Sequence, residues 1–303
     1  MAKIVGIGAC VMDTLYNIPK YPAEDTKMRA TGCKLAGGGP TATALVAAAK
    51  LGESSSYIGV LSDDNGGVFL KGDFEKYGVG VENVVIKSGY RSFTSVLWLC
   101  EDTATRTCVF DKGTLPPLSL NESQIKAIRE AEILMVDGNE MSAARDAAAI
   151  ARESGVKVLY DCGGLYEGVE KLLALTDIMI PSEEFALRHT GCSDVTEAAK
   201  KLHGLYSPQV VVITQGKLGG IIYDGKEVRK YPAFVVDAVD TNGSGDVFHG
   251  AFAAGVAKGY DYPKCCIFSS AVSAIKCMGV GSRENAPDYE TTNKFLKENG
   301  YEL

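Results

Sequence analysis

The sequence has little of what membrane proteins, secreted proteins and metal enzymes usually contain. Its 303 residues include only three histidines, of which His189 and His203 have no ligand spacing, and its nine cysteines include no C-x-x-C pair. No apolar run approaches the roughly 18 residues that span a bilayer, so we expect no membrane association. An odd number of cysteines, mostly in apolar surroundings, favours reduced thiols in a cytoplasmic protein over a disulfide framework.

The charge balance is acidic. A formal net charge of −7 and a pI near 5.2 argue against nucleic acid or an anionic membrane surface as the main partner. Anionic small molecules are not excluded, because local arginines and lysines decide how they bind. With 46% hydrophobic residues the chain can bury a full core. Composition therefore predicts a folded protein whose partners are neither nucleic acid nor membrane.

Strand-like and helix-like patterns alternate along most of the chain, which predicts an α/β layered fold with a largely parallel sheet. Six apolar segments are expected strands: Ile4–Ala9, Ser56–Val60, Ile133–Val136, Val156–Tyr160, Ile178–Ile180 and Val210–Thr214. Four segments with apolar residues at helical spacing are expected helices: Thr41–Lys50, Gly66–Tyr77, Ser142–Ser154 and Thr196–Leu205. No repeat or long linker interrupts the pattern, so we expect a single domain over residues 1–303.

Two regions, at about 15–35 and 90–112, break this alternation. The first is polar and irregular, and the second alternates like a pair of exposed strands. Strands outside a parallel core predict a small β-sheet lid over a site. Such a lid would keep water out during a group transfer, because water is a competing acceptor.

The most informative segment is D-T-N-G-S-G-D at residues 240–246, in which two carboxylates flank a turn of small residues ahead of an apolar, helix-like run. A glycine-rich turn that opens a helix leaves backbone N–H groups unpaired at the positive end of the helix dipole, where a phosphate can bind. Asp246, in the first turn, is ionised at neutral pH and can accept a proton from an attacking hydroxyl. The same residues also suit a simple helix cap, so the segment alone leaves both readings open.

Four segments together resemble the pfkB, or ribokinase-like, family of carbohydrate kinases. They are D-T-N-G-S-G-D at 240–246, which matches the signature D-T-x-G-A-G-D with Ser244 in the alanine position, G-G-G-P-T-A-T-A at 37–44, V-I-T-Q-G-K-L-G-G at 212–220 and K-C-M-G-V-G-S-R at 276–283. Their order and spacing are similar to the family's over essentially the whole chain. The resemblance implies a ribokinase-like layered α/β/α fold with a lid. It also implies a kinase that uses ATP and Mg²⁺ to phosphorylate a hydroxyl of a sugar or sugar-like substrate.

The resemblance implies roles for individual residues. Asp246 would be the general base. The backbone N–H groups that would form an anion hole for the γ-phosphoryl group are those of Gly243, Ser244 and Gly245. The residues that would bind the sugar are Asp13, Gly38, Gly39 and Thr43. The residues that would bind the nucleotide are Thr214, Gly216, Gly219 and Gly281. The residues that would take part in a monovalent-cation site for K⁺ are Asp240 and Asn242.

Two positions depart from the family pattern. Many members have a sugar-binding Asn where our alignment has Thr43, whose hydroxyl replaces an amide with both donor and acceptor, so the hydroxyl pattern being read must differ. The family often has N-x-x-E near the hydrated magnesium, where this chain has S-E-E-F at 182–185. Either Glu183 or Glu184 substitutes, or the outer shell of the metal is built differently. Magnesium would mainly be held by nucleotide phosphates and waters.

Within the family, G-G-G-P-T-A-T-A, V-I-T-Q-G and D-V-F-H-G-A-F look most similar to the branch of sulfofructose kinases and ketohexokinases. Where a sulfonate-binding Arg would be expected, this chain has residues near Asn139, so the resemblance does not imply a sulfonated sugar as the substrate. The alternative function is a nucleoside kinase of the same family, because the ribose of a nucleoside presents similar hydroxyls. A regulator without catalysis is disfavoured by Asp246. A dinucleotide oxidoreductase is excluded by the missing third glycine after Gly6 and Gly8.

Two further side chains, Trp98 and His249, lie in or near the expected site, and the sequence suggests roles for them. Trp98, in the expected lid, could stack on substrate or on another subunit, and a homodimer through the lid is therefore an expected possibility. His249 follows Asp246 by almost a full helical turn, and we expect it to pack beside the site rather than act as a second acid or base.

Overall fold

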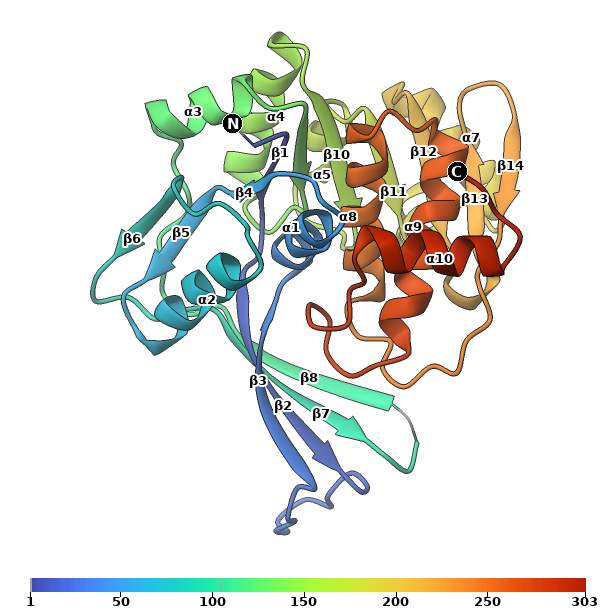
Figure 1. The fold of residues 1–303 in the computed structure, drawn as a ribbon. Helices are drawn as coiled ribbons and strands as arrows, with labels where there is room; N and C mark the ends of the chain where they lie inside the picture. The colour runs from blue at the N-terminus through green and yellow to red at the C-terminus, as the bar shows by residue number, and fades with distance from the viewer. Residues whose placement is uncertain (1, 104) are drawn as a thin grey trace.

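An eight-stranded sheet runs through the middle of the computed structural model, which describes residues 2–103 and 105–303 (Figure 1). Its order is β14-β13-β12-β11-β10-β9-β1-β4. The strands are β1 (Ile4–Ile7), β4 (Ser55–Tyr57), β9 (Ile133–Val136), β10 (Lys157–Cys162), β11 (Ile178–Pro181), β12 (Val210–Thr214), β13 (Gly220–Tyr223) and β14 (Val228–Tyr231). Neighbours from β4 to β12 are parallel, and β13 and β14 are antiparallel at one edge. The predicted α/β fold with a largely parallel sheet is confirmed.

The central strands are apolar on both sides, because helices cover both faces of the sheet. In β9, Ile133 and Met135 belong to one buried cluster, and Leu134 and Val136 belong to another. Successive side chains of a strand point to opposite faces, so continuous apolar runs mark strands that are buried twice. This is why runs of apolar residues were enough to locate these strands.

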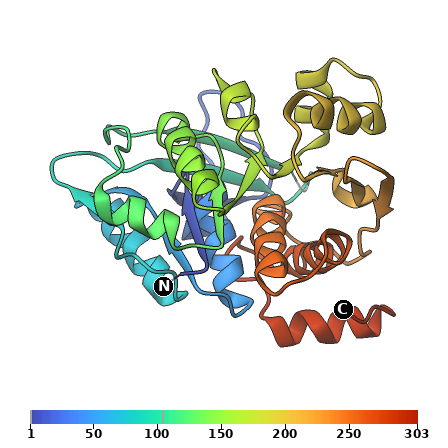
Figure 2. The same ribbon diagram turned by 90° about the horizontal axis from the view of Figure 1, so that it is seen from above.

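Ten helices of the described chain form the two outer layers (Figure 2). One face carries α1 (Pro40–Lys50), α2 (Asn65–Lys76), α8 (Ser244–Ala257), α9 (Tyr262–Cys277) and α10 (Tyr289–Glu298). The other carries α3 (Glu122–Arg129), α4 (Met141–Glu153), α5 (Val169–Leu173), α6 (Glu183–Thr190) and α7 (Val195–Tyr206). None of these helices is long and apolar enough to cross a membrane.

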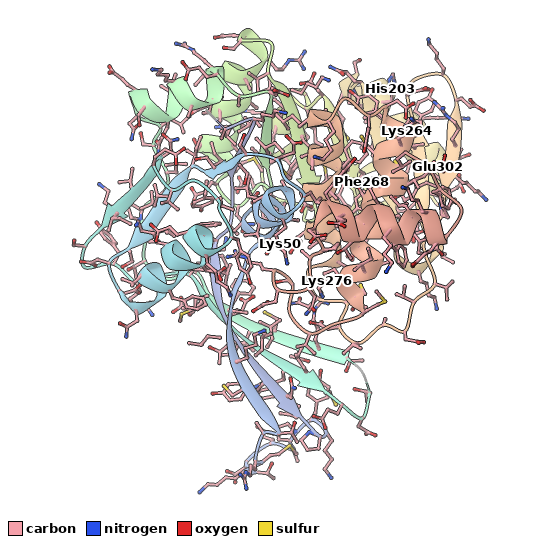
Figure 3. The ribbon with its side chains drawn as sticks, in the orientation of Figure 1. Lys50, His203, Lys264, Phe268, Lys276 and Glu302 are labelled. Atoms are coloured by element: carbon pink, nitrogen blue, oxygen red, sulfur yellow. The ribbon has the colours of Figure 1, made fainter. Side chains whose placement is uncertain are left out.

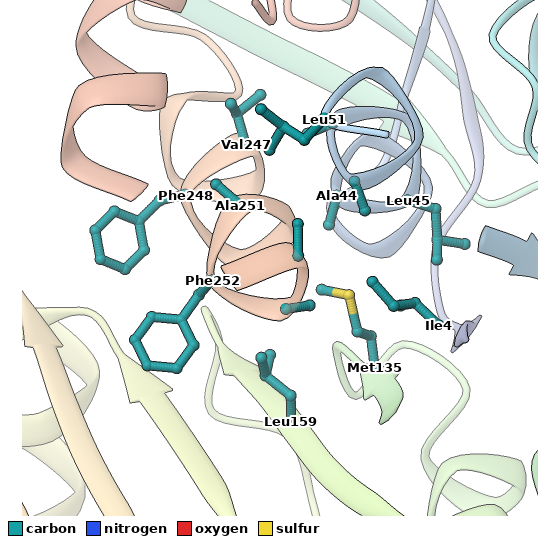
Figure 4. Close-up of a cluster of buried hydrophobic side chains, with 14 of the residues drawn as sticks. Ile4, Ala44, Leu45, Leu51, Met135, Leu159, Val247, Phe248, Ala251 and Phe252 are labelled. Carbon is teal, nitrogen blue, oxygen red and sulfur yellow. The ribbon is translucent and has the colours of Figure 1, made fainter. Parts of the chain in front are cut away.

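Helix α8 lies at the centre of its layer, between α1 and α9. Figure 4 shows Val247 and Ala251 of α8 on the side of Leu51 and Ala44, and Phe252 on the opposite side of α8, in a cluster that also contains residues of the sheet. Small residues allow a close approach, and a Cβ at Gly250 would collide with the Ala44 carbonyl. The start of α8 is therefore held by a tightly packed core.

A separate four-stranded sheet extends from one end of the body, as Figure 1 shows, and is the lid. Its order is β3-β2-β7-β8. The strands are β2 (Val11–Ile18), β3 (Gly32–Gly38), β7 (Thr94–Cys100) and β8 (Thr105–Asp111). The lid strands thus come from the two predicted regions, but β2 begins earlier than expected. Asp13 consequently lies inside a lid strand, ahead of the region at about 15–35 where the lid was expected to begin.

The segment predicted as one strand at Ser56–Val60 is divided in the structure. Its first part is β4 of the main sheet, and its second part is β5 (Gly59–Ser62), which pairs with β6 (Val84–Lys87) in a two-stranded sheet. Ile58 lies at the break and is fully buried. Hydrophobicity alone does not mark this change of direction, because both parts are apolar.

Arg283 ties the C-terminal segment to the opposite end of the chain. Its guanidinium is 1% exposed and pairs with Asp73 of α2 at 2.5 Å. It also donates to the Gly38 carbonyl at 2.6 Å and lies 3.5 Å from the Thr43 hydroxyl. A buried charge is tolerated only when it is paired and hydrogen-bonded, and here each contact fixes a different element.

We predict that Arg283→Met lowers the free energy of unfolding by about 3–5 kcal/mol, because it leaves the Asp73 carboxylate without its cation. Urea denaturation measures this loss. Arg229→Met is the matched control: it removes an exposed pair with Asp224, for which about 0–1 kcal/mol is expected. Equal losses in the two variants would contradict the bracing role of Arg283.

Candidate active site

The turn before α8 is shaped by Gly243. This residue has φ 73°, in the left-handed region, and a Cβ added to it would collide with Ser282. Both facts require glycine here. A Cβ at Gly245 would meet nothing within 4 Å, so the space in front of that residue is open. The chain therefore presents bare backbone toward an open space at the N-terminus of a 14-residue helix.

The backbone N–H groups of this turn differ in whether they are hydrogen-bonded to the protein. The Ser244 N–H donates to the Thr241 carbonyl at 3.2 Å, whereas no acceptor among the described residues is bonded to the N–H of Gly243 or Gly245. Two amides of the predicted anion hole are thus free to bind an anion, and the third is engaged in a turn. The helix dipole favours negative charge at this point.

Asp246 lies in the first turn of α8, beside these amides. Burial raises the pKa of its carboxyl, and the charge of Asp137 adds to the increase. The charges of His249, Arg106 of the lid and Arg283 oppose it. A carboxylate whose pKa is raised toward neutrality is a stronger proton acceptor than an ordinary Asp.

His249 lies behind the site, with both ring nitrogens close to oxygen atoms. Its Nδ1 lies 2.6 Å from the Gly245 carbonyl and 3.4 Å from Asp161 Oδ2, and its Nε2 lies 3.1 Å from the Ile180 carbonyl. The ring thus joins the first turn of α8 to the ends of β10 and β11, which goes beyond the expected packing role. It also counteracts the burial that raises the pKa of Asp161 to about 7.

A cavity of about 550 Å³ begins at this helix start and runs along α9. It is lined by Ser244 and Gly245, by apolar side chains from β14 to the 233–238 segment, and by α9. The predicted nucleotide residues Thr214, Gly216 and Gly219 line it as well. Gly281 does not line it; its N–H donates to Asp240 Oδ2 at 2.9 Å. A cavity with a helix start and mostly apolar walls suits a nucleotide.

Asp13 and the paired glycines form a second group. Asp13 is 8% exposed and accepts from Ser95 Oγ of β7 at 2.6 Å. A Cβ at Gly38 would collide with the Asp13 carboxylate, and one at Gly39, which has φ 92°, would collide with the Ala9 carbonyl. Burial raises the pKa of Asp13 to about 6, and the charge of Asp246 contributes to the increase. Gly38 therefore makes room for the carboxylate itself, and Gly39 makes room for the Ala9 carbonyl.

Thr43 lies outside this group. Its side chain is fully buried in α1, and its hydroxyl faces Arg283. Its position does not support the prediction that its hydroxyl reads the sugar, because no surface of the side chain is accessible. A smaller cavity of about 250 Å³ lies nearby, at the ends of β1 and β9. Its polar lining includes Lys112 and Asn139, neither of which the sequence analysis selected as a binding residue.

The residues predicted to hold a monovalent cation surround a lysine instead. Lys276 of α9 is fully buried; its Nζ donates to the Asp240 carbonyl at 2.7 Å and lies 3.6 Å from Asp240 Oδ2. Burial lowers the pKa of Lys276, and the Asp240 charge opposes that decrease. The backbone N–H of Asn242 donates to Asp240 Oδ1 at 2.8 Å. The oxygens here already accept hydrogen bonds or face the ammonium, so as ligands they do not fit a potassium ion.

The two candidate carboxylates for magnesium differ in position. Glu183 accepts from Gln215 at 2.9 Å, at the end of β12 beside the larger cavity. Glu184 is exposed and pairs with Arg188 one turn along α6. No cluster of three or more metal-ligating side chains occurs in residues 2–103 and 105–303. Any Mg²⁺ would thus be held mainly by phosphates and waters, a pattern that suits this ion.

The start of α8 suits an anion and has the carboxylate of Asp246 beside it. A cavity of nucleotide size lies on one side of it, and the buried Asp13 carboxylate with its glycines lies on the other. This arrangement is that of a phosphotransferase site. The chain matches the model described as pfkB family carbohydrate kinase over residues 1–288, and it belongs to that family. It is an ATP-dependent kinase that phosphorylates a hydroxyl of a sugar or sugar-like substrate.

Known proteins resemble the chain over nearly its whole length. It is 25% identical to a ribokinase of Haemophilus influenzae, with 96% of this chain and 97% of that protein covered. It is 25% identical to an ATP-dependent ribose-1-phosphate kinase of Halopiger xanaduensis, with 98% and 99% covered. Among solved structures, the Arabidopsis thaliana ribokinase complexed with ribose and ATP superposes with a TM-score of 0.87 at 23% identity, covering 98% and 99%. The closer resemblance to sulfofructose kinases and ketohexokinases stays a prediction.

Sugar affinity should depend on the ionisation of Asp13. Its carboxylate must be charged to accept two hydroxyl hydrogen bonds, and its raised pKa means that it is half protonated near pH 6. We predict that the sugar Kd of the wild type rises as the pH falls through about 6. Calorimetric titrations measure this, and in an Asp246→Asn background the rise should be centred at a lower pH, because the charge of Asp246 contributes to the raised pKa of Asp13. In Asp13→Asn the same pH range should change nothing; a persistent pH dependence would assign it to another group.

Proposed function

We propose that Asp246 is the general base of this kinase and that the free amides at the start of α8 bind the γ-phosphoryl group of ATP. The observation that carries the proposal is the position of Asp246, in the first turn of the helix whose Gly243 and Gly245 amides have no acceptor among the residues that the structure describes. The cavity for the nucleotide opens at the same turn. Base, anion hole and donor thus meet at one point, as phosphoryl transfer requires.

The reaction is a single displacement at phosphorus. The acceptor hydroxyl gives its proton to the Asp246 carboxylate while its oxygen forms a bond to the γ-phosphorus. The bond between that phosphorus and the bridging oxygen to the β-phosphate breaks, and ADP keeps the electron pair. The amides of Gly243 and Gly245 stabilise the charge on the equatorial oxygens, since they are already in place and need no reorganisation.

Magnesium would enter with ATP and neutralise the charge on its phosphates. Of this chain's carboxylates, Glu183 would contact its hydration shell, because it lies at the end of β12 beside the nucleotide cavity. Asp13 would hold the acceptor by two hydroxyls, and the lid strands that carry Asp13 and Ser95 would exclude water from it.

The acceptor we propose is a sugar of pentose size, since the names of the two curated relatives specify ribose and ribose 1-phosphate. ADP release across free pentoses, ketohexoses, sugar phosphates and nucleosides tests this. A free or phosphorylated pentose should give the highest kcat/KM. The highest kcat/KM with a nucleoside would favour the alternative, a nucleoside kinase of the same family.

We also propose a homodimer through the lid, in a cytoplasmic enzyme. Leu35, Val96, Trp98 and Val109 occupy paired or alternate positions of the lid strands, so they share one face, and all four are exposed. An exposed apolar face of this kind is typical of an interface. Light scattering should give twice the monomer mass for the wild type and the monomer mass for Trp98→Asp; a monomeric wild type would contradict the dimer.

We predict that Asp246→Asn lowers kcat by roughly 10²–10⁴-fold with ATP affinity nearly unchanged. The substitution is nearly isosteric, and Asn is also favourable at a helix start, so the fold should be kept. Steady-state kinetics and ATP titration measure the two effects. Asp261→Asn is the matched control, because Asp261 caps α9 without lining the cavity, and it should keep wild-type turnover. Wild-type turnover in Asp246→Asn would remove this residue from the mechanism.

A further inference from the structure

We propose that the ammonium group of Lys276 does in this chain what a monovalent cation would do beside the anion hole, so that the enzyme works without potassium. The inference rests on the proposed function, because the ammonium would act on the turn that binds the γ-phosphoryl group. Lysine is almost never fully buried unless it is paired, and Lys276 has no exposed surface.

The ammonium lies where the predicted ion would lie. It donates to the Asp240 carbonyl at 2.7 Å and lies 3.6 Å from Asp240 Oδ2. Asp240 was the carboxylate that the resemblance implied for the ion. Figure 3 shows Lys276 at the end of α9 nearer the lid, with Lys264 near the opposite end of the helix. An ammonium and a potassium ion carry the same charge and both bind carbonyl and carboxylate oxygens.

The other oxygens that could bind an ion are engaged. Lys50 Nζ bonds the carbonyls of Arg283 at 3.1 Å and Glu284 at 2.8 Å. The Asn285 side chain donates to the Val280 carbonyl. The two carboxylate oxygens of Asp240 accept backbone N–H groups of Asn242 and Gly281. An incoming potassium ion would have to displace these donors and would be repelled by two ammonium groups.

The ammonium also has a path to the anion hole. It fixes the Asp240 carbonyl, and Asp240 in turn fixes the Asn242 N–H, one residue before Gly243. The same helix holds the turn a second time, since Ser273 Oγ donates to the Ser244 carbonyl at 3.0 Å. Lys276 is thus a positioning residue that fixes the backbone amides without contacting the substrate.

The wild-type enzyme gives the first test. Its kcat should be the same in potassium, sodium and tetramethylammonium chloride at constant ionic strength and saturating Mg²⁺ and ATP. The readout that does not need activity is thallium(I) NMR, because thallium(I) substitutes for potassium in its binding sites. No saturable thallium site is expected. Activation by potassium together with a saturable thallium site would overturn the proposal.

The second test removes the ammonium. Lys276→Ala should lower kcat by about 10-fold or more, since it loosens the amides that stabilise the transition state. Potassium or ammonium ions should restore part of the loss because they fit the space left behind, whereas tetramethylammonium should not. Lys264→Ala, on the exposed end of α9, is the control and should neither lose activity nor respond to potassium. Wild-type kcat of Lys276→Ala in tetramethylammonium would overturn the positioning role.

Two outcomes separate this proposal from the proposed function. If Lys276→Ala does not fold, as judged by circular dichroism and ATP binding, the wild-type measurements still decide the question. If the wild type phosphorylates no sugar, the proposed function fails, while thallium binding still shows whether the region around Asp240 takes an ion. In that case a saturable thallium site overturns the inference, and its absence supports it.

Discussion

The left-handed conformation of Gly243 is the constraint on which the site depends. It places a residue with open space before it, Gly245, at the start of α8, and it brings the backbone against Ser282, where no side chain fits. Glycine adopts this conformation without strain, so the position of the turn depends on contacts from its surroundings. The chain supplies them from both sides: α9 holds the turn through Lys276 and Ser273, and His249 holds the first turn of α8 against the sheet. Contacts from α9 and from the sheet thus meet at the helical turn where we propose the anion hole.

The proposed sugar site around Asp13 is likewise held in place by the C-terminal segment that contains Arg283. Asp13 lies on a lid strand, and Gly38, which makes room for it, is fixed by Arg283, 245 positions away in the chain. Arg283 follows directly on Ser282, the residue that Gly243 contacts. The proposed acceptor site and the proposed anion hole are therefore held by neighbouring residues of one segment.

The sequence predicted those features that depend on local patterns. Buried parallel strands are apolar on both faces, so Ile133–Val136 and Val210–Thr214 were found with their observed bounds. Glycines before a helix predicted the turn at Gly243. Features that depend on tertiary contacts were missed. Nothing local divides Ser56–Val60 between two sheets or places Asp13 within a strand, and the Thr43 hydroxyl faces Arg283 across a separation of 240 positions. The available signal for Lys276 was a lysine among small and apolar residues near the end of α9.

The central claim is that the transferring phosphoryl group binds at the Gly243 and Gly245 amides, with Asp246 on the acceptor hydroxyl. The most direct measurement is a crystal structure with ADP, magnesium, aluminium fluoride and the best acceptor sugar, grown in potassium chloride. The account predicts the planar fluoride on the two amides, the Asp246 carboxylate within hydrogen-bond distance of one sugar hydroxyl, and Lys276 Nζ still on the Asp240 carbonyl. Fluoride bound away from the start of α8, or Asp246 turned away from the sugar, would contradict it.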